Sequence, residues 1–181
     1  MKVYGRALDP IHIGAGGYRL GRVDNTIVRE PATNVPKIPG TSISGVIRAF
    51  AEIIKNKSNS NINIEELFGS SPGNSNLKKG KLRFYDAQII FFPISSIQGT
   101  VWITTKELLE YWFEEIENKN GESIKIPENI GDKAYPIKGI NTDKPLNLGW
   151  LLLEVERVDS GKEIVLPKEV KEWVVRIVVV S

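Results

Sequence analysis

The sequence predicts an α+β domain built on an antiparallel sheet. Segments rich in β-branched and aromatic residues alternate with segments whose apolar residues recur at helical spacing. Their order is strand, helix, two strands, helix, and then strand, helix, strand. This order is typical of ferredoxin-like folds, whereas a parallel, doubly wound sheet fits it less well.

The first half of the chain supplies one strand and one long helix. Lys2–Leu8 alternates well enough to form a strand, and a glycine-rich loop follows it. Thr41 or Ser42 is expected to cap a helix with a clear core face. The polar tract 55–63 is expected to be an exposed connection, with a short helical turn after it at Ile64–Phe68. The residues expected on the core face are Ile43, Val46, Ile47, Phe50, Ala51 and Ile54.

The next part supplies two strands and a helix. Leu82–Pro93 and Gln98–Ile103 are rich in β-branched and aromatic residues, which predicts two strands. Thr104 and Glu107 have capping-box spacing, so we expect a helix to begin there. The residues expected on its buried side are Leu108, Leu109, Trp112, Phe113 and Ile116.

The C-terminal part predicts a buried strand at Leu148–Arg157, a turn at 159–161, a short helix at Lys168–Trp173 and a final strand at Val174–Val180. The final strand is hydrophobic and no polar tail follows it. We therefore expect an exposed edge that another chain or further sequence must cover.

A single domain, residues 1–181, is expected from the length of the chain. Within it, residues 118–147 are rich in Gly, Pro, Lys and Asp. A compact domain rarely keeps an idle loop of this length, so we expect an extended hairpin or arm that packs on a partner.

The composition excludes several classes of protein and site. No apolar run is long enough to cross a bilayer and no signal peptide is recognisable, which predicts a cytoplasmic protein with no membrane association. The absence of cysteine excludes disulfides, thiolate nucleophiles and zinc-cysteine sites. His12 is the one histidine, so a site that needs two histidines is excluded as well. Any catalysis therefore rests on carboxylates, hydroxyls or cations.

Charge is distributed unevenly along the chain. Residues 1–50 hold seven basic and three acidic side chains, a net charge of +4, and the whole-chain value of +2 leaves −2 for the remainder. A basic segment beside a mildly acidic remainder indicates a polyanionic partner, although a solvated loop that only maintains solubility is the alternative. The basic residues are Lys2, Arg6, Arg19, Arg22, Arg29, Lys37 and Arg48.

The glycine-rich loop does not match either nucleotide-binding motif. A dinucleotide fingerprint needs glycine at the position of Arg19, and the Gly-Lys-Ser/Thr of a P-loop is absent. Gly14 and Gly16 still provide backbone that a phosphate or base can approach closely, although a plain turn explains them too. His12, just before them, is expected to be structural or to contact a base.

Asp24 is the sharpest candidate for chemistry. It follows Arg22, and no other carboxylate occurs before Glu30. Neighbouring cations keep a carboxylate ionised, and beside RNA it can hold a divalent cation or help to activate a 2′-hydroxyl. A salt bridge to Arg22 or Arg29 is the alternative. Downstream, the turn at Pro39–Ser42 places a helix N-terminus where it suits a phosphate.

Five runs, in this order, carry a family resemblance: IHIGAGG, GRVDNTIVRE, PKIPGTSISGVIRAF, LFG and RFYDAQIIFFPISSIQGTVWIT. Together they resemble the RAMP-superfamily backbone subunit of type III CRISPR effector complexes, most closely subunit four of the Cmr complex. VDNTIVREP is equally similar to subunit three of the Csm complex. The resemblance implies a ferredoxin-like, RRM-related domain whose copies stack in a filament along CRISPR RNA (crRNA), together with other subunits of the complex.

The resemblance also implies an activity and its residues. A thumb hairpin, for which 118–147 is the best candidate, interrupts pairing with the target RNA, and Asp24 supports cleavage there with a divalent cation such as Mg²⁺ or Mn²⁺. Ser44 and Gln98 stand where many relatives have lysine, which predicts fewer phosphate contacts. The positions expected to bind RNA are His12, Gly14, Gly16, Arg19, Arg22, Arg29, Lys37, Gly40, Ser42 and Arg48.

The resemblance implies that the relatives continue beyond the strand that ends at Ser181, so the C-terminal part of the fold looks shortened.

Three interpretations of the function remain open at this point. The chain is expected to be a subunit that cleaves target RNA through Asp24. The alternatives are a structural RNA-binding subunit with Asp24 in a salt bridge, and a metal-independent guide-processing endoribonuclease with His12 as its general base.

Overall fold

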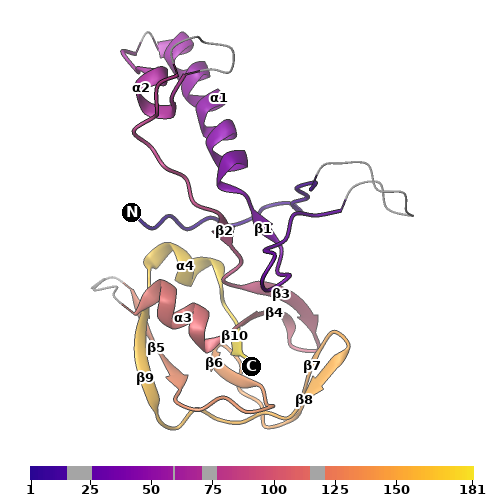
Figure 1. Cartoon of the computed structure of the whole chain (residues 1–181). Helices are drawn as coiled ribbons and strands as arrows, with labels where there is room; N and C mark the ends of the chain where they lie inside the picture. Colours follow the sequence, from indigo (N-terminus) through magenta and orange to yellow (C-terminus); the bar gives the residue numbers. More distant parts are fainter. Residues whose placement is uncertain (16–25, 59, 71–76, 115–120) are drawn as a thin grey trace. The chain divides into compact units, whose positions relative to one another are not determined.

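The computed structural model describes residues 1–15, 26–58, 60–70, 77–114 and 121–181 (Figure 1). By its contacts the chain divides into two compact units. Unit 1 comprises Met1–Leu8 and Ile90–Ser181, and unit 2 comprises Asp9–Ile89. Among the described residues, no helix is long and apolar enough to cross a membrane. The expectation of a single domain stays a prediction.

Unit 1 is built on a four-stranded sheet with the strand order β3-β4-β10-β6. β3 and β4 form an antiparallel hairpin, and β10 runs parallel to β4 and antiparallel to β6. This mainly antiparallel α+β arrangement confirms the predicted fold class. The strands are β3 Phe92–Ser96, β4 Gly99–Thr104, β6 Tyr135–Lys138 and β10 Ile177–Val179.

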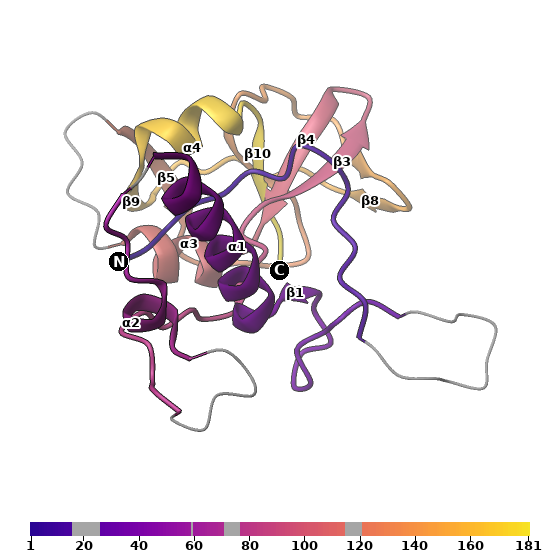
Figure 2. The ribbon, with the colours of Figure 1, turned by 90° about the horizontal axis from the view of Figure 1, so that it is seen from above.

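Helices and short strand pairs cover this sheet. The helices are α3 Lys106–Phe113 and α4 Lys168–Trp173, and the antiparallel pairs are β5 Glu122–Pro127 with β9 Gly161–Leu166 and β7 Leu146–Leu148 with β8 Leu151–Leu153. Figure 2 shows α3 and α4 on one side of β10 and β8 on the other.

Two apolar clusters fill the two faces of the sheet. Ile177 and Val179 of β10 belong to one cluster and Val178 belongs to the other, as the alternation of a strand requires. The first cluster contains Leu109, Phe113, Ile124, Ile126, Tyr135, Ile164, Leu166, Val170, Val174, Ile177 and Val179. The second contains Val101, Ala134, Leu146, Leu148 and Val178.

The final strand is not the exposed edge that the sequence predicted. Ile177, Val178 and Val179 are each 0% exposed, because β4 and β6 pair with the two sides of β10. Burial on both faces and pairing on both sides explain why this segment is uninterruptedly apolar. The prediction of an edge that another chain must cover was therefore wrong for β10.

The expected arm at 118–147 also differs from the structure in its described part, residues 121–147. Ile124 and Ile126 of β5 and Tyr135 of β6 are at most 5% exposed and lie in the first cluster. The abundance of Gly, Pro, Lys and Asp in this segment obscured a short alternation of apolar and polar residues in β5. These residues form core strands of unit 1 rather than an extended arm.

The N-terminal segment forms no strand, contrary to the prediction for Lys2–Leu8. Instead it binds the C-terminal end of α3. Lys2 Nζ donates to Tyr111 O at 3.0 Å, and Tyr4 Oη donates to Trp112 O at 3.1 Å. A cation and a hydroxyl thus satisfy carbonyls that have no partner within the helix.

Two further boundaries differ from the sequence prediction. Thr105, and not Thr104, caps α3, with its Oγ1 accepting the Leu108 N–H at 3.4 Å. The strand predicted at Leu148–Arg157 is broken by a turn at Gly149, whose φ of +74° favours glycine. Ile116, predicted on the buried side of α3, lies outside the described residues.

Unit 2 contains two helices and a short strand pair. Its elements are β1 Lys37–Ile38, α1 Gly40–Ser58, α2 Ile64–Phe68 and β2 Ala87–Gln88, with β1 antiparallel to β2. The structure confirms the short helix at Ile64–Phe68. α1 continues to Ser58, into the tract predicted as a connection, and only Ala87–Gln88 and the start of β3 are strands within the predicted Leu82–Pro93.

The apolar face of α1 forms no core within unit 2. Val46, Ile47, Phe50 and Ile54 are between 41% and 61% exposed, and Gly40 is the only buried residue of the helix. Within the unit α1 packs mainly against α2, which is only five residues long. The spacing that predicted the helix was correct, whereas the prediction of a buried face was wrong.

Candidate nucleic-acid interface

The basic N-terminal segment forms two adjoining backbone ladders in unit 2. Ala15 N–H donates to Thr26 O at 2.7 Å, and Val28 N–H donates to Ile13 O at 2.8 Å. On its other side the segment around residue 28 pairs with 35–37, where Lys37 N–H donates to Val28 O at 3.2 Å. Residues 13–15 and 26–28 therefore hold together the two ends of the segment that contains Asp24.

Four of the predicted site residues lie outside the described part of the chain, namely Gly16, Arg19, Arg22 and Asp24. Of the described ones, His12 is exposed and Gly14 forms a ladder bridge with Ile27. This bridge gives Gly14 a structural position beside the Asp24 segment. Contact of either residue with RNA stays a prediction.

Lys37 is already engaged with two carboxylates. Its Nζ lies 2.9 Å from Glu30 Oε2 and 2.6 Å from Asp86 Oδ2, and its side chain is only 18% exposed. The hydrogen bonds to Asp86 and Glu30 raise the pKa of Lys37, and the bond from Lys37, together with the Gly40 N–H, lowers the pKa of Asp86. The charge of Lys37 therefore supports the fold and is poorly available to a phosphate.

The N-terminus of α1 is likewise occupied. Gly40 N–H donates to Asp86 Oδ1 at 2.8 Å, so Asp86, rather than Thr41 or Ser42, bonds the first amide of the helix. Gly40 is required by a close approach, because a Cβ there would lie 2.3 Å from Phe84 O. A carboxylate at this end competes with a phosphate for the same amides, and Ser42 is half-buried in the first turn.

Asp86 is the residue of this network that sequence reasoning missed. It lies 46 positions beyond Gly40 in the chain, so no local spacing connects the two. The available signal was a lone carboxylate in the apolar run LRFYDAQII, since an acidic residue in a strand-like segment needs a partner.

The two remaining arginines differ in how they are used. Arg29 is exposed, and its Nη1 donates to Asn34 O at 2.8 Å, so it has no carboxylate partner among the described residues. Arg48 bonds Glu52 at 3.2 Å and Gly69 O at 3.3 Å, which ties α1 to the end of α2. Arg29 is therefore more available to a phosphate than Arg48.

A second basic cluster, defined as Lys78, Lys79, Lys81 and Arg83, follows α2. Lys81 forms an ion pair with Glu66. Lys78 and Lys79 are exposed and have no ion pair in the described part of unit 2. Ser70 N–H donates to Lys78 O, Lys78 N–H donates to Ser70 Oγ, and a bridge joins Gly69 and Lys79, so the backbone of this segment is fixed. Lys78 and Lys79 are thus exposed to solvent on a backbone that hydrogen bonds fix in place.

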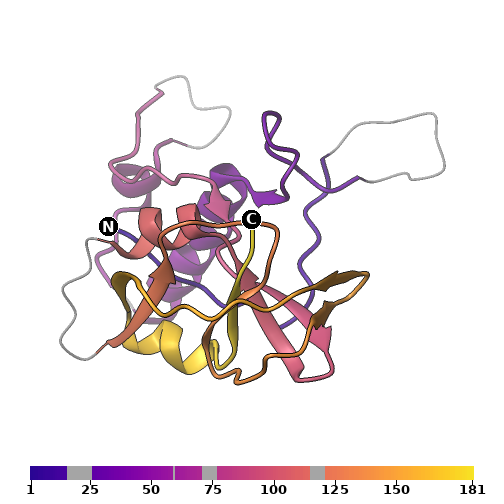
Figure 3. The same ribbon diagram turned by 90° about the horizontal axis from the view of Figure 1, so that it is seen from below.

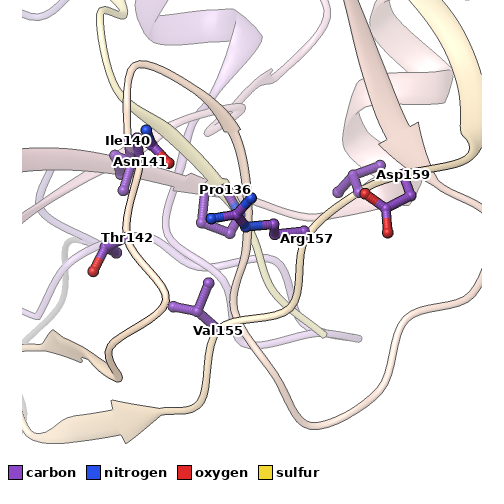
Figure 4. Close-up of a pocket in the computed structure, with 8 residues that line it drawn as sticks. Pro136, Ile140, Asn141, Thr142, Val155, Arg157 and Asp159 are labelled. Carbon is purple, nitrogen blue, oxygen red and sulfur yellow. The ribbon is translucent and has the colours of Figure 1, made fainter.

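Unit 1 holds a small hollow of about 230 Å³ between β6 and the segment after β8 (Figure 4). Its one lining cation, Arg157, forms two bonds with Asp143, Nε to Oδ1 at 2.7 Å and Nη2 to Oδ2 at 2.9 Å. That guanidinium is neutralised locally. The other lining residues are Pro136, Ile140, Asn141, Thr142, Val155, Val158 and Asp159.

In the part of the chain that the structure describes, no group of three or more His, Asp or Glu side chains is placed to hold a metal ion. Asp24 lies outside that part. The candidate interface thus consists of exposed cations in unit 2 and a backbone ladder that bounds the Asp24 segment.

Comparison with known proteins identifies related chains. A model of the RAMP superfamily matches residues 6–178. The chain is 30% identical over 157 residues to the CRISPR system Cmr endoribonuclease Cmr4 of Pyrococcus furiosus. This alignment covers 85% of this chain and 52% of that protein. It is 31% identical over 129 residues to the CRISPR system Cms endoribonuclease Csm3 of Methanothermobacter thermautotrophicus. This alignment covers 66% of this chain and 51% of that protein. The chain spans about half the length of these relatives.

Solved structures show the same fold. Oligomeric Cmr4 from Pyrococcus furiosus superposes with a TM-score of 0.64 at 24% identity, covering 96% of this chain and 65% of the other. A chain of the type III-B Cmr-beta complex in its apo state superposes with a TM-score of 0.63 at 18% identity, covering 94% of this chain and 62% of the other. At these identities the likeness establishes the fold.

Proposed function

The chain belongs to the RAMP superfamily, and from this premise we propose that it is an RNA-binding backbone subunit of a type III CRISPR effector complex. In this proposal it binds crRNA and target RNA together with further copies of itself and with other subunits of the complex. The proposed location of the complex is the cytoplasm. Within the assembled complex, Asp24 supports metal-dependent cleavage of the target RNA.

One observation carries the proposal, namely that the family match extends over residues 6–178 and includes all of the basic segment except its first five residues. Two relatives, Cmr4 and Csm3, are named as endoribonucleases of CRISPR systems. A third structure with the same fold is a chain of the Cmr-beta complex bound to cognate target RNA, with a TM-score of 0.56. The exposed Arg29, Lys78 and Lys79 give unit 2 the charge that an RNA backbone attracts.

In this proposal, some residues of the chain position the Asp24 segment and Asp24 itself holds the cation. The ladder between 13–15 and 26–28 holds the ends of the Asp24 segment, and the Lys37–Asp86 pair ties that ladder to the start of α1. A carboxylate offers oxygen ligands, which suit Mg²⁺ or Mn²⁺. Asp24 would hold the cation through its carboxylate oxygens. When bound, the cation would stabilise negative charge on the reacting phosphate.

The test is cleavage of a complementary target RNA by the complex assembled with crRNA, in Mg²⁺, in Mn²⁺ and in excess chelator. We expect cleavage that requires the metal and is lost in Asp24→Asn, while crRNA binding persists. Asp9→Asn is the matched control, because Asp9 is an exposed aspartate of the same basic segment and the change in charge is identical.

The other outcomes separate the alternatives. Unchanged cleavage in Asp24→Asn, with crRNA still bound, contradicts the role of Asp24. Binding with no cleavage in any metal assigns a structural subunit. If a precursor of the guide RNA is supplied instead of target, cleavage of that precursor that survives the chelator and is lost in His12→Ala assigns metal-independent guide processing. Complex size on RNAs of increasing length tests the filament, for which we expect one added copy per fixed increment of RNA.

A further inference from the structure

Two hairpins lie beside each other in unit 1, β3–β4 and β7–β8, with strand β3 in contact with strand β7 (Figure 3). A hollow of about 390 Å³ opens between them, which is within the usual size range of ligand sites. It is lined by Ser95, Ser96 and Ile97 from one hairpin and by Pro145, Asn147 and Gly149 from the other.

Large apolar side chains point into solvent at both tips. Trp150 is 97% exposed and Ile97 is 88% exposed. The hairpin that carries Trp150 is anchored, because Leu146 and Leu148 are at most 3% exposed and lie in the second apolar cluster. A tryptophan held outside on an anchored hairpin keeps a large apolar surface in water, which is unfavourable unless a ligand covers it.

The polar groups of the hollow can recognise a flat heterocycle. Ser96 shapes the turn, since its Oγ donates to Gly99 O at 2.9 Å and accepts the Gln98 N–H at 3.1 Å. The Ser95 hydroxyl and the Asn147 amide line the hollow and can each donate and accept a hydrogen bond. Trp150 does not line the hollow, but it directly follows Gly149, which does. Two edge-reading groups with an aromatic side chain on the adjoining turn match the way single-stranded RNA bases are held.

Charge around the hollow favours a phosphate-linked ligand. No carboxylate lines it. Arg176 Nη1 lies 3.5 Å from the position that a Cβ on Gly99 would take, so the guanidinium is beside the β3–β4 turn. Lys144 is exposed and directly precedes Pro145 of the lining. Neither cation forms an ion pair within the described residues, so both are available to the sugar-phosphate backbone on either side of a bound base.

We propose that this hollow binds one nucleobase of single-stranded RNA, with Trp150 stacked on the base and Asn147 and Ser95 bonded to its edge. The proposal rests on the proposed function, because it assumes that the chain binds RNA. Leu151 and Leu152 of β8 are also exposed, at 47% and 68%, but a hollow without carboxylates and with Lys144 and Arg176 near it fits a phosphate-linked ligand better than an apolar protein face.

The test measures binding of a fluorescein-labelled 15-nucleotide single-stranded RNA by anisotropy, with tryptophan emission followed in parallel. We expect RNA to quench emission in the unaltered chain and not in Trp150→Phe, which retains stacking and most of the affinity. Trp150→Ala and Trp150→Leu should each weaken binding about 5- to 100-fold, because both remove the aromatic face. Tyr111→Ala, at an aromatic position that is 68% exposed on α3, is the control and should bind normally.

Each remaining outcome overturns the proposal in a distinguishable way. Unchanged binding in Trp150→Ala rejects the hollow while the proposed function stands. Normal binding in Trp150→Leu shows an apolar contact without stacking and also rejects it. Loss of self-association in Trp150→Ala, with RNA affinity unchanged, assigns the surface to a protein contact. Absence of RNA binding by the unaltered chain rejects both proposals. Circular dichroism of the variants checks folding, which an exposed position should not affect.

Discussion

Lys37 and Asp86 form an ion pair with 2.6 Å between Nζ and Oδ2, while the other oxygen of Asp86 accepts the Gly40 N–H at 2.8 Å. One side chain thus joins the basic segment to the first turn of α1, across 46 positions of sequence. Lys37 adds Glu30 to the same network at 2.9 Å. The network ties residues 30–37, which follow the Asp24 segment in the chain, to the first turn of α1.

Substitution of Asp86 should therefore lower the thermal midpoint of unfolding in a defined order. Asp86→Asn keeps an oxygen for the Gly40 amide and loses the charge pair, whereas Asp86→Ala loses both. We expect the thermal midpoint of Asp86→Asn to be lower than that of the unaltered chain, and the midpoint of Asp86→Ala to be lower still. Asp143→Ala, which removes an exposed ion pair with Arg157, should have the smaller effect. Equal midpoints for the Asn and Ala variants would show that the Gly40 bond contributes nothing.

The same pair predicts a pH dependence of stability. The pKa of Asp86 is lowered, so its contribution is present above the ordinary value of about 3.9 and is lost as the pH falls through the lowered pKa. The pKa of Lys37 is raised, so its contribution is present below about 10.4 and is lost as the pH rises through the raised pKa. Urea unfolding of the unaltered chain and of Asp86→Asn should show a difference that is constant near neutrality and shrinks in acid. A difference that persists unchanged to the lowest pH would contradict this assignment.

Two glycines of α1 should respond to alanine with opposite signs. A Cβ at Gly40 would lie 2.3 Å from Phe84 O, so Gly40→Ala forces a backbone shift and should destabilise the protein by about 1 to 3 kcal/mol. A Cβ at Gly45 meets nothing within 4 Å, so Gly45→Ala should stabilise the helix by about 0.5 to 1 kcal/mol. Denaturant unfolding measures both. Destabilisation by Gly45→Ala would mean that something covers this face of α1.

Sequence reasoning succeeded where the signal was local. The spacing of apolar residues located α1, the short helices α2 and α4 lie where they were predicted, and the ordered motifs indicated the family. It failed where the outcome depended on distant partners. β10 is an interior strand of the sheet because β4 and β6 pair with it. Lys37 is not available to a phosphate because Asp86 pairs with it. Burial and charge neutralisation are properties of the assembled fold, and a single sequence shows neither.

The interior position of β10 gives a matched pair of core substitutions. Val179 is 0% exposed and Val175, four residues earlier, is 54% exposed. Val179→Ala should cost about 2 kcal/mol, because it removes buried methyl groups from a paired strand. Val175→Ala should change the free energy of unfolding by less than about 0.5 kcal/mol. If the two variants unfold alike, β10 is not held between β4 and β6 in solution.

The final prediction separates cations that are open to RNA from those that the fold has already used. Lys79 is exposed and without an ion pair in the described part of unit 2, whereas Lys37 is held by Glu30 and Asp86. If Lys79 neutralises one phosphate, Lys79→Ala should reduce the salt dependence of single-stranded RNA binding by about 0.7 in log–log slope and leave the thermal midpoint unchanged. Lys37→Ala should instead lower the midpoint and keep the slope, since it leaves Glu30 and Asp86 without their shared cation. The reverse pattern, a slope change in Lys37→Ala alone, would place the RNA backbone at β1.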